Sequence, residues 1–479
     1  MAAHMSFRDP SGFCIRVDGH ILRLVRREGL DALEAFLGSE TARDAIRRGQ
    51  VVESRRLDSS EAKHWLERLA TENSGVEIRA DDVLYEHARI PFVSYPSEWP
   101  AEMLHAAADF TLDFSLRLLE SGMGLKDATP YNILFNGPNP VLVDLLSAEN
   151  RVSGDPIWLP YAQFCRTFLF PLLMWRYWQL DPAGFFLLHR EGMEPNAFYR
   201  LCGWGRRLRS PVLQHVSLPV WLGSRACGET ASIPRALRNA EQTRFVLKNM
   251  FGGLRSAING ACPPARTKTV WIDYMGTHSY SEAGFSSKEA LVRDFLGLAK
   301  PKSVLDVGSN TGHFSRLAAK TGARVVAIDY DSCCTGSLWR QARQENLNIL
   351  PLVVNLARPT PAVGWRNDEC SSFLDRAEGA FDTVLMLAVV HHLLVTERVP
   401  LPELAELIER LTTDWAVIEY VPPDDPMFRR IVRGREHLHV GLTASSFEAA
   451  FASRFSLSRR EPIPNSGRIL YLFRKAGRT

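Results

Sequence analysis

Two short apolar runs that each end near an aspartate, joined by a glycine-bearing turn, constrain the fold of this chain more than any other feature. The first run reaches Asp306, the turn contains Gly308 and Gly312, and after a stretch with helical spacing the second run reaches Asp329. A strand, a turn, a helix and a second strand in this order form the βαβ unit that holds nucleosides in open parallel sheets. Glycine lets the backbone pass close to a ligand, and a carboxylate after the second strand can accept hydrogen bonds from ribose hydroxyls. The sequence therefore predicts a nucleoside-binding βαβ unit.

Further apolar runs extend this unit into a larger sheet. Because strands buried on both faces read as short continuous apolar runs, we expect five parallel strands, at 304–307, 325–328, 350–354, 383–387 and 416–420. An amphipathic helix is predicted between the fourth and fifth strands, at 401–411. The chain ends in two alternating runs, 455–458 and 468–473, on either side of a turn rich in proline, asparagine and glycine. That pattern is typical of an antiparallel hairpin.

Length, charge and cysteine content exclude several classes of protein. The 479 residues predict two or three domains, and the net charge of +3 argues against a dedicated nucleic-acid-binding protein. Eight cysteines without a Cys-x-x-Cys pair suit neither a zinc ribbon nor a disulfide framework. The densest apolar run, 168–175, is far shorter than the ~20 residues that span a bilayer, and no signal peptide is recognisable. We expect a cytoplasmic protein that has neither a membrane nor a nucleic acid as a partner.

Several segments, taken together, resemble one bacterial methyltransferase family. They are 271–280, 305–314, 355–366, 387–393 and 418–425. The family joins a kinase-like N-terminal region to a class I S-adenosylmethionine-dependent methyltransferase domain, and nodulation-type host-specificity proteins are among its members. Its first motif, Asp-x-Gly-x-x-x-Gly, matches Asp306, Gly308 and Gly312, whereas Asn310 stands where a dehydrogenase would have glycine. The resemblance implies S-adenosylmethionine, not NAD, as the cofactor.

The same resemblance implies a fold for each half of the chain. The C-terminal domain is expected to be α/β, with the Rossmann-like seven-stranded sheet of class I methyltransferases, and a kinase-like α+β domain is expected before it. We place the kinase-like domain at 1–262, a linker with a lid or helical segment at 263–300, and the S-adenosylmethionine-binding domain at 301–479. The polar, proline-bearing stretch 262–268 indicates the boundary.

The resemblance also implies which residues contact the cofactor. Asp306 and Gly308 are expected beside its methionine part, with the turn that follows beneath it. Asp329 would accept the ribose hydroxyls, and Tyr330 would lie beside the adenine. Asn355, after the third strand, meets the adenine edge or simply forms a turn. The complete predicted cofactor site is Asp306, Gly308, Ser309, Asn310, Gly312, Asp329, Tyr330, Asn355 and Leu387.

Candidates for catalysis follow the fourth and fifth strands. Open parallel sheets bind ligands beyond the carboxyl ends of their strands, where His391 and His392 fall. Either histidine can take a proton or orient the methyl acceptor, and we favour His391; alternatively, one caps the next helix and the other packs. Glu419 ends the fifth strand, where it binds an ammonium or hydroxyl group of the substrate or pairs with Arg429. We predict no metal, because adjacent histidines cannot easily point at one ion.

An aromatic segment that precedes the first strand is the main candidate for substrate binding. Trp271, Tyr274 and Tyr280 would cover the cofactor as a lid, as in many small-molecule methyltransferases. Water exclusion by such a lid would strengthen the electrostatic contacts inside. Packing of these rings between the domains is an equal alternative. Arg429 is the remaining candidate for contact with the substrate.

The N-terminal half resembles protein-kinase-like and aminoglycoside-phosphotransferase-like folds at one place. Asp127 and Asn132 precede a strand, a turn and a strand that ends in Asp144, like the catalytic and metal-binding loops of those folds. No glycine-rich loop is recognisable, and Arg23 stands where the lysine would be expected. Because phosphoryl transfer depends on metal ions and a phosphate cradle, we interpret this half as a non-catalytic scaffold that shapes the acceptor pocket or recruits a partner.

The sequence thus predicts an S-adenosylmethionine-dependent methyltransferase that transfers a methyl group in line to a small polar metabolite, in bacterial specialised metabolism. A first alternative is a protein or carrier-bound substrate that docks on the N-terminal domain. A second alternative is a bifunctional kinase–methyltransferase in which Asp127, Asn132 and Asp144 are active.

Overall fold

The structure, a computed structural model, describes residues 3–4, 8–71, 78–79, 81–223, 239–264 and 282–477. The chain forms two compact units. The first comprises Met1–Ser97, Ala101–Pro263 and Val363–Cys370, and the second comprises Glu98–Pro100, Pro264–Ala362 and Ser371–Thr479. The main division therefore lies after Pro263, and each unit includes one short segment from the other half of the chain.

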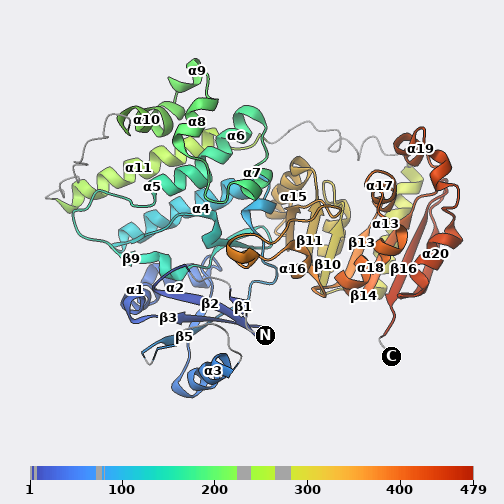
Figure 1. Cartoon of the computed structure of the whole chain (residues 1–479), viewed down its shortest axis with the longest axis horizontal. Coiled ribbons are helices and arrows are strands. Elements are labelled where there is room, and N and C mark those ends of the chain that lie inside the picture. Colours follow the sequence, from blue (N-terminus) through green and yellow to red (C-terminus); the bar gives the residue numbers. More distant parts are fainter. Residues whose placement is uncertain are drawn as a thin grey trace. The chain divides into compact units, whose positions relative to one another are not determined.

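The first unit begins with a five-stranded antiparallel sheet of order β1-β2-β3-β5-β4, drawn in blue in Figure 1. The strands are β1 (Ala3–His4), β2 (Gly12–Val17), β3 (His20–Val25), β4 (Ser54–Arg56) and β5 (Val83–His87), and the helices are α1 (Arg27–Gly38), α2 (Glu40–Arg47) and α3 (Ser59–Thr71). Trp65 and Leu66 of α3 pack against Leu22, Leu24 and Leu84 of the sheet. This apolar contact covers one face of the sheet with α3.

The rest of the first unit is mainly helical. The buried helix α4 (Ala101–Glu120) is followed by two antiparallel strand pairs, β6 (Met123–Leu125) with β9 (Ala148–Asn150) and β7 (Ile133–Asn136) with β8 (Asn139–Leu142). The helices after them are α5 (Tyr161–Phe164), α6 (Phe170–Trp178), α7 (Pro182–Leu188), α8 (Pro195–Leu201), α9 (Trp204–Arg207), α10 (Leu218–Gly223) and α11 (Ala240–Gly260). The apolar run 168–175 is helical and buried. Within the described residues, no helix combines the length and apolar character needed to cross a membrane.

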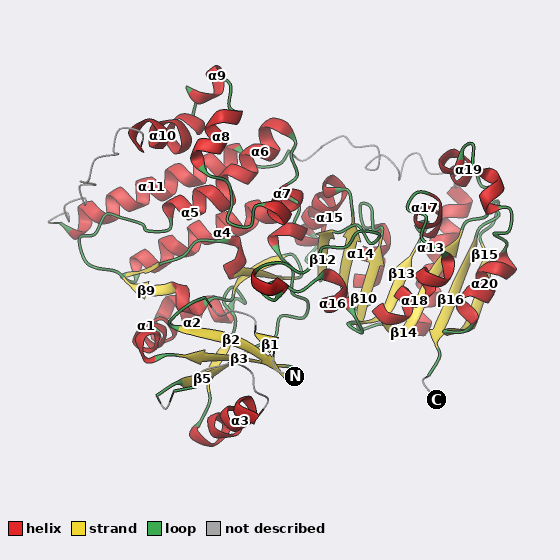
Figure 2. Cartoon of the chain, viewed as in Figure 1, coloured by secondary structure: helices red, strands yellow, loops and turns green. Residues whose placement is uncertain are grey.

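The second unit is built on a seven-stranded sheet of order β12-β11-β10-β13-β14-β16-β15, with helices on both faces (Figure 2). The strands are β10 (Ser303–Val307), β11 (Arg324–Asp329), β12 (Ile349–Val353), β13 (Phe381–Met386), β14 (Thr412–Tyr420), β15 (Phe455–Pro462) and β16 (Ile469–Lys475). The first five are parallel, and β16 is antiparallel to both of its neighbours. The five parallel strands, the terminal hairpin and the seven-stranded class I methyltransferase sheet are thus confirmed.

The helices of the second unit are α13 (Glu282–Ala299), α14 (His313–Ala319), α15 (Ser332–Gln344), α16 (Phe373–Ala377), α17 (Val390–Val395), α18 (Leu401–Leu411), α19 (Pro426–Val432) and α20 (Ala444–Ala452). The helices α13, α14 and α15 share one apolar core with the sheet, in which Phe295 and Leu338 meet Leu385 and Leu472. Burial of each such side chain contributes about 1.5–3 kcal/mol.

The strand order places a topological switch point between β10 and β13. From β10 the chain moves outward through β11 to β12 and then returns to β13 on the other side of β10. Ligands of open α/β sheets bind in the crevice beyond the carboxyl ends of the strands at such a point. The residues that follow β10, β11 and β13 are therefore the expected contacts of a ligand.

Candidate functional site

The turn after β10 is held in place by the neighbouring strand. The amides of Gly308 and Ser309 both donate to the carbonyl oxygen of Ile328, at 2.8 and 3.0 Å. Gly308 and Gly312 have φ angles of +69° and +79°, which favour glycine. A Cβ at Gly308 would lie 2.3 Å from Cγ2 of Val389, and one at Gly312 would lie 2.1 Å from Cδ1 of Leu338. The nearest atoms to a Cβ at either position would thus belong to protein side chains. Packing therefore requires glycine at both positions, in addition to the close approach of a ligand that the sequence indicated.

Asp329 is the last residue of β11, and its carboxylate contacts the turn after β10. Oδ2 accepts the amide of Asn310 at 2.8 Å, and Oδ1 accepts the amide of Asp331 at 2.9 Å. Burial is the main influence on its pKa and raises it to about 6, against the lowering effect of these amides. A carboxylate has about four acceptor positions, so Asp329 retains capacity for a hydroxyl donor. This capacity is compatible with a ribose, and the contact itself stays a prediction.

Asp306 is the second buried carboxylate of the crevice. The hydroxyl of Ser315 donates to its Oδ2 at 2.5 Å, and burial, the largest influence, raises its pKa to about 7. The hydroxyl oxygen of Ser309 is also buried and has no hydrogen-bond partner among the described residues. A ligand with a cationic or hydrogen-bonding group would stabilise these polar atoms, so the crevice fits the methionine part of S-adenosylmethionine.

The remaining predicted cofactor residues lie at three places. Tyr330 follows Asp329 and is exposed, and Leu387 is buried in the core at the end of β13. Asn355 forms a turn, in which its Oδ1 accepts the amide of Ala357 at 2.9 Å. This turn was one of the two alternatives for Asn355, and a contact with adenine stays a prediction.

The two histidines lie in the first turn of α17, directly after β13. Their ring centroids are 4.3 Å apart, and the His391 ring stacks on Phe428 at 6.3 Å. His391 is 2% exposed, and its Nδ1 has no hydrogen-bond partner in the part of the chain that the structure describes. Burial first, and then His392, Arg468 and Lys288, lower the pKa of His391 well below its usual value. His391 is therefore a neutral imidazole at neutral pH.

Glu419 belongs to a buried ionic network that also contains Lys288, Arg468 and Asp425. Its carboxylate lies 2.6 Å from Nζ of Lys288 and 3.1 Å from Nη1 of Arg468. Arg468 also binds Asp425 through Nε at 2.8 Å and Nη2 at 3.1 Å. The predicted pair of Glu419 with Arg429 is wrong, because Arg429 lies on the exposed face of α19. Fully buried Glu419 needs buried cations instead.

Lys288 and Arg468 are the residues that sequence reasoning missed. Lys288 lies on the same face of α13 as Val292 and Phe295, which are buried. A lysine in an apolar stripe was the available signal, since a buried lysine requires a partner. Arg468 had no such signal before its place beside β14 was known.

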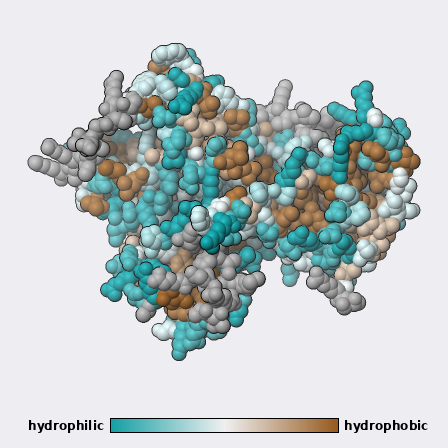
Figure 3. Space-filling model, viewed as in Figure 1, coloured by the Kyte–Doolittle hydropathy of each residue, from teal (hydrophilic) through white to brown (hydrophobic). Residues whose placement is uncertain are grey.

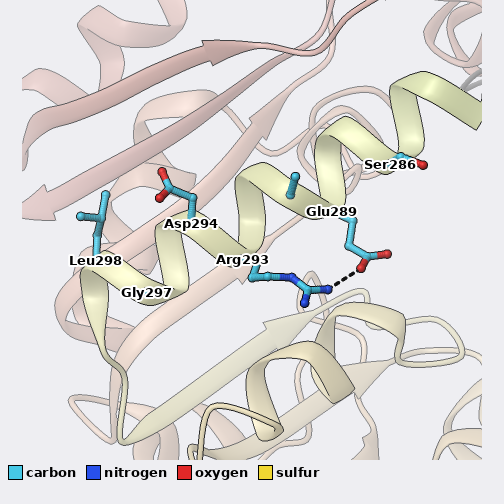
Figure 4. Close-up of a pocket in the computed structure, with 7 residues that line it drawn as sticks. Ser286, Glu289, Arg293, Asp294, Gly297 and Leu298 are labelled. Carbon is cyan, nitrogen blue, oxygen red and sulfur yellow. Dashed lines mark hydrogen bonds and ion pairs between the residues drawn. The ribbon is translucent and has the colours of Figure 1, made fainter.

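Two further features are the predicted lid and a surface hollow on α13. Trp271, Tyr274 and Tyr280, the predicted lid, fall outside the described residues. A surface hollow runs along α13 and is lined by Ser286, Glu289, Ala290, Arg293, Asp294, Gly297 and Leu298 (Figure 4). In it Glu289 pairs with Arg293 at 2.6 Å, and none of the predicted site residues lines it.

Among the kinase-like residues of the first unit, Arg23 and Asp144 are paired, whereas Nδ2 of Asn132 is buried without a hydrogen-bond partner among the described residues. Nη1 of Arg23 binds Oδ1 of Asp144 at 2.9 Å, and Nε of Arg23 donates to Nε2 of His87 at 3.0 Å. Burial, followed by the charge of Arg23, lowers the pKa of His87 to about 3. Asp127 lies near Asp144, and burial, followed by that neighbour, raises its pKa. Among the described residues, no cluster of histidine, cysteine or acidic side chains could hold a metal ion.

The chain is similar to known proteins over its whole length and over parts of it. Residues 280–439 match the family described as a methyltransferase domain. Over 472 residues the chain is 30% identical to the nodulation protein NoeA of Rhizobium meliloti (strain 1021), which covers 98% of this chain and 95% of NoeA. Over 134 residues it is 28% identical to the O-antigen chain terminator bifunctional methyltransferase/kinase WbdD of Escherichia coli, which covers 27% of this chain and 17% of WbdD. The N-methyltransferase NodS from Bradyrhizobium japonicum WM9 aligns with a TM-score of 0.31 and 14% identity, over 41% of this chain and 99% of NodS.

Proposed function

This chain belongs to the family of the nodulation protein NoeA and carries a class I S-adenosylmethionine-dependent methyltransferase domain; from this premise we propose that it methylates a small polar metabolite in bacterial specialised metabolism. The observation that carries the proposal is the buried Nδ1 of His391, which has no hydrogen-bond partner among the described residues and lies beyond β13 at the switch point. A buried polar atom without a partner costs about 1–3 kcal/mol, so a polar acceptor group is the occupant that this atom favours.

The residues of the crevice divide the binding of the cofactor between them. Asp329 would accept the ribose hydroxyls, while Asp306 and Ser309 would bind the methionine part, since positive charge is favoured beside a buried carboxylate. When bound, S-adenosylmethionine supplies an electrophilic methyl group on a sulfonium. The protein therefore needs no covalent intermediate, and its main contribution is to align the acceptor with that carbon, a kind of effect that is worth roughly 7–11 kcal/mol in well-oriented reactions.

His391 aligns the acceptor in this proposal. Its lowered pKa keeps the imidazole neutral, so one ring nitrogen can accept a hydrogen bond from a hydroxyl or amine of the acceptor. The same lowered pKa makes His391 a weak base, so we assign to it the orientation of the acceptor and not the removal of its proton. His392, whose pKa is also lowered by burial and then by Arg468, supports the His391 ring by contact.

Glu419 has a structural role in this proposal. Both of its carboxylate oxygens are within 3.1 Å of a buried cation, which removes the need for a substrate ammonium as the partner. The ionic network links α13, the end of β14 and the start of β16, three segments that border the crevice. Its expected contribution is to hold α17 and His391 against the sheet.

We propose further that the first unit is a non-catalytic scaffold. In a phosphotransferase, a lysine would bind phosphate and the aspartate after the second strand would bind the metal. Here Arg23 and Asp144 bind each other at 2.9 Å. Arg23 therefore lies where a metal ion would bind Asp144, and Asp144 lies where phosphate would bind the residue at position 23. This pair disfavours the bifunctional alternative that the kinase part of WbdD suggests.

Calorimetry of cofactor binding tests the methyltransferase assignment. The variant Asp329→Ala removes the ribose acceptor and is expected to weaken S-adenosylmethionine binding roughly tenfold to hundredfold, the range for hydrogen bonds to a charged group. Asp294→Ala, an exposed aspartate of α13, is the matched control and should bind as the unchanged protein does. Unchanged affinity in Asp329→Ala would contradict the assignment of the site. Labelled cofactor added to extracts of the organism that makes this protein would then reveal the methylated product.

A further inference from the structure

The helices α8, α9 and α10 of the first unit carry an exposed patch that the methyltransferase function does not use. Its apolar members are Leu201, Trp204, Leu208, Leu218 and Leu222, and its basic members are Arg200, Arg206, Arg207 and Arg209; we call this set the Trp204 patch. Trp204 is 74% exposed and Leu222 is 63% exposed. Large apolar side chains rarely gather on a free surface without a partner.

The acidic and basic residues of the segment 195–223 are all basic. Between residues 195 and 223 the sequence contains four arginines and neither aspartate nor glutamate. Within the described residues, none of these arginines pairs with a carboxylate, although two of them lie on aromatic rings. Arg206 lies 4.8 Å from the ring of Tyr177, and Arg207 lies 4.0 Å from that of Tyr199. The guanidinium groups are thus held at the surface with their charge unneutralised.

Local packing brings the members of the patch together. The short helix α9 contacts the π-helical segment Leu213–Ser217, and that segment also contacts α8 and leads directly into α10. In Figure 1 these helices form the green end of the first unit, with α9 at its tip. Figure 3 shows hydrophobic and hydrophilic residues intermingled there.

We propose that the Trp204 patch docks this protein peripherally on an anionic membrane surface. Tryptophan and leucine partition into the boundary between headgroups and acyl chains, and arginine keeps its charge at headgroup level. Anionic lipids attract each basic residue near the surface, and the effect decreases with added salt. The absence of any acid from 195–223 favours this partner, because an acid would be repelled by the headgroups. The protein is held on the bilayer and does not span it.

Vesicle flotation with the full-length protein tests this proposal. The protein should float with vesicles of phosphatidylcholine and phosphatidylglycerol, should not float with phosphatidylcholine alone, and should be released by salt. The double variant Trp204→Ala with Leu208→Ala is expected to weaken binding about tenfold or more, through loss of buried apolar surface. The double variant Arg200→Ser with Arg209→Ser should also weaken binding about tenfold or more, through loss of two charges.

A matched control separates the patch from exposed residues in general. Phe245 is 69% exposed on α11 and follows the exposed Arg244, so Phe245→Ala with Arg244→Ser changes one aromatic and one basic side chain elsewhere on the same unit. This control should bind vesicles within about twofold of the unchanged protein. Equal binding by the patch variants, equal binding to neutral vesicles, or an equal loss in the control would each overturn the proposal. Capture of an acidic protein without any vesicle binding would replace the membrane with a protein partner and overturn it too.

Discussion

The candidate sites of the two units differ in how their charged groups are paired. In the second unit, Nδ1 of His391 and the hydroxyl oxygen of Ser309 have no hydrogen-bond partner among the described residues, and Asp329 retains acceptor capacity. In the first unit, Arg23 binds both Asp144 and His87, while Nδ2 of Asn132 is buried without a hydrogen-bond partner among the described residues. A polar atom without a protein partner is available to a ligand, whereas the paired charges of Arg23 and Asp144 already satisfy each other.

Burial raises carboxylate pKa values in both units, that of Asp127 in the first and those of Asp306 and Asp329 in the second. Burial raises the pKa of Asp306 to about 7 and that of Asp329 to about 6, because no cation of the protein pairs directly with either carboxylate in the described residues. In the first unit Asp144 is paired with Arg23, and the positive charge of Arg23 helps to lower the pKa of His87. Perturbed carboxylates in a crevice are typical of functional sites, while internally paired charges are typical of structural ones.

The largest expected effect concerns the ionic network of the second unit. Arg468→Met leaves Glu419 and Asp425 buried without their shared cation, and we expect a loss of about 3–5 kcal/mol in the free energy of unfolding. Arg23→Met should cost less, about 1–3 kcal/mol, because Asp144 is 27% exposed and can be hydrated. Urea denaturation measures both values.

A control for this pair of variants lies on β16, which begins directly after Arg468. Arg474 of β16 is exposed and binds Asp414 at 3.3 Å, so Arg474→Met should change the free energy of unfolding by no more than about 1 kcal/mol. If Arg468→Met were as mild as this control, the network would not support the crevice, and Glu419 would again be a candidate for substrate binding.

The second prediction concerns orientation of the acceptor. His391→Gln is expected to reduce the rate of methyl transfer roughly hundredfold, since a small misplacement of a reacting group has an effect of this size. Affinity for S-adenosylmethionine should remain within about twofold, because His391 follows β13 and lies apart from the ribose acceptor Asp329. His392→Gln, the matched variant, should have the smaller effect. Transfer from labelled cofactor gives the rate, and full activity in both variants would remove the histidines from the mechanism.

The third prediction is a pH dependence of cofactor binding. The folded pKa of Asp329 is raised, so between its ordinary value and about 6 the folded protein binds more protons than the unfolded chain, and this contribution to stability is lost as the pH rises through about 6. Donation from ribose hydroxyls favours the ionised carboxylate and lowers that pKa again. Binding of S-adenosylmethionine should therefore release protons near pH 6 and strengthen as the pH rises. Calorimetry in two buffers with different ionisation enthalpies measures the release.

Asp329→Asn gives the control for this pH dependence. The amide keeps the shape of the side chain but does not titrate, so proton release should decrease to what Asp306 contributes. Equal proton release in the variant and the unchanged protein would assign the titration to another group.

The part of this organisation that depends on local pattern was predictable from the sequence. Buried parallel strands read as apolar runs, so the strands, the glycine turn and the position of His391 beyond β13 could be predicted. Lys288 and Arg468 were missed, because their partner Glu419 is far away in sequence and only the assembled sheet brings them together. The exposure of Trp204 could not be predicted either, since tryptophan is more often packed against a core than left at a surface.

The smallest expected effect is the sharpest test of the contrast between the units. Mg-ATP should not raise the melting temperature, because only a ligand that binds the folded protein stabilises it. Asp144, which would bind the metal ion, is already paired with Arg23. S-adenosylmethionine, in the same experiment, should raise the melting temperature and serves as the positive control. Arg23→Lys sharpens the test: it restores the residue that kinases use but not a glycine-rich loop, so Mg-ATP should still have no effect. A rise with Mg-ATP in the unchanged protein would mean that the Arg23–Asp144 pair opens for nucleotide, and the first unit would then be a second binding domain and not a scaffold.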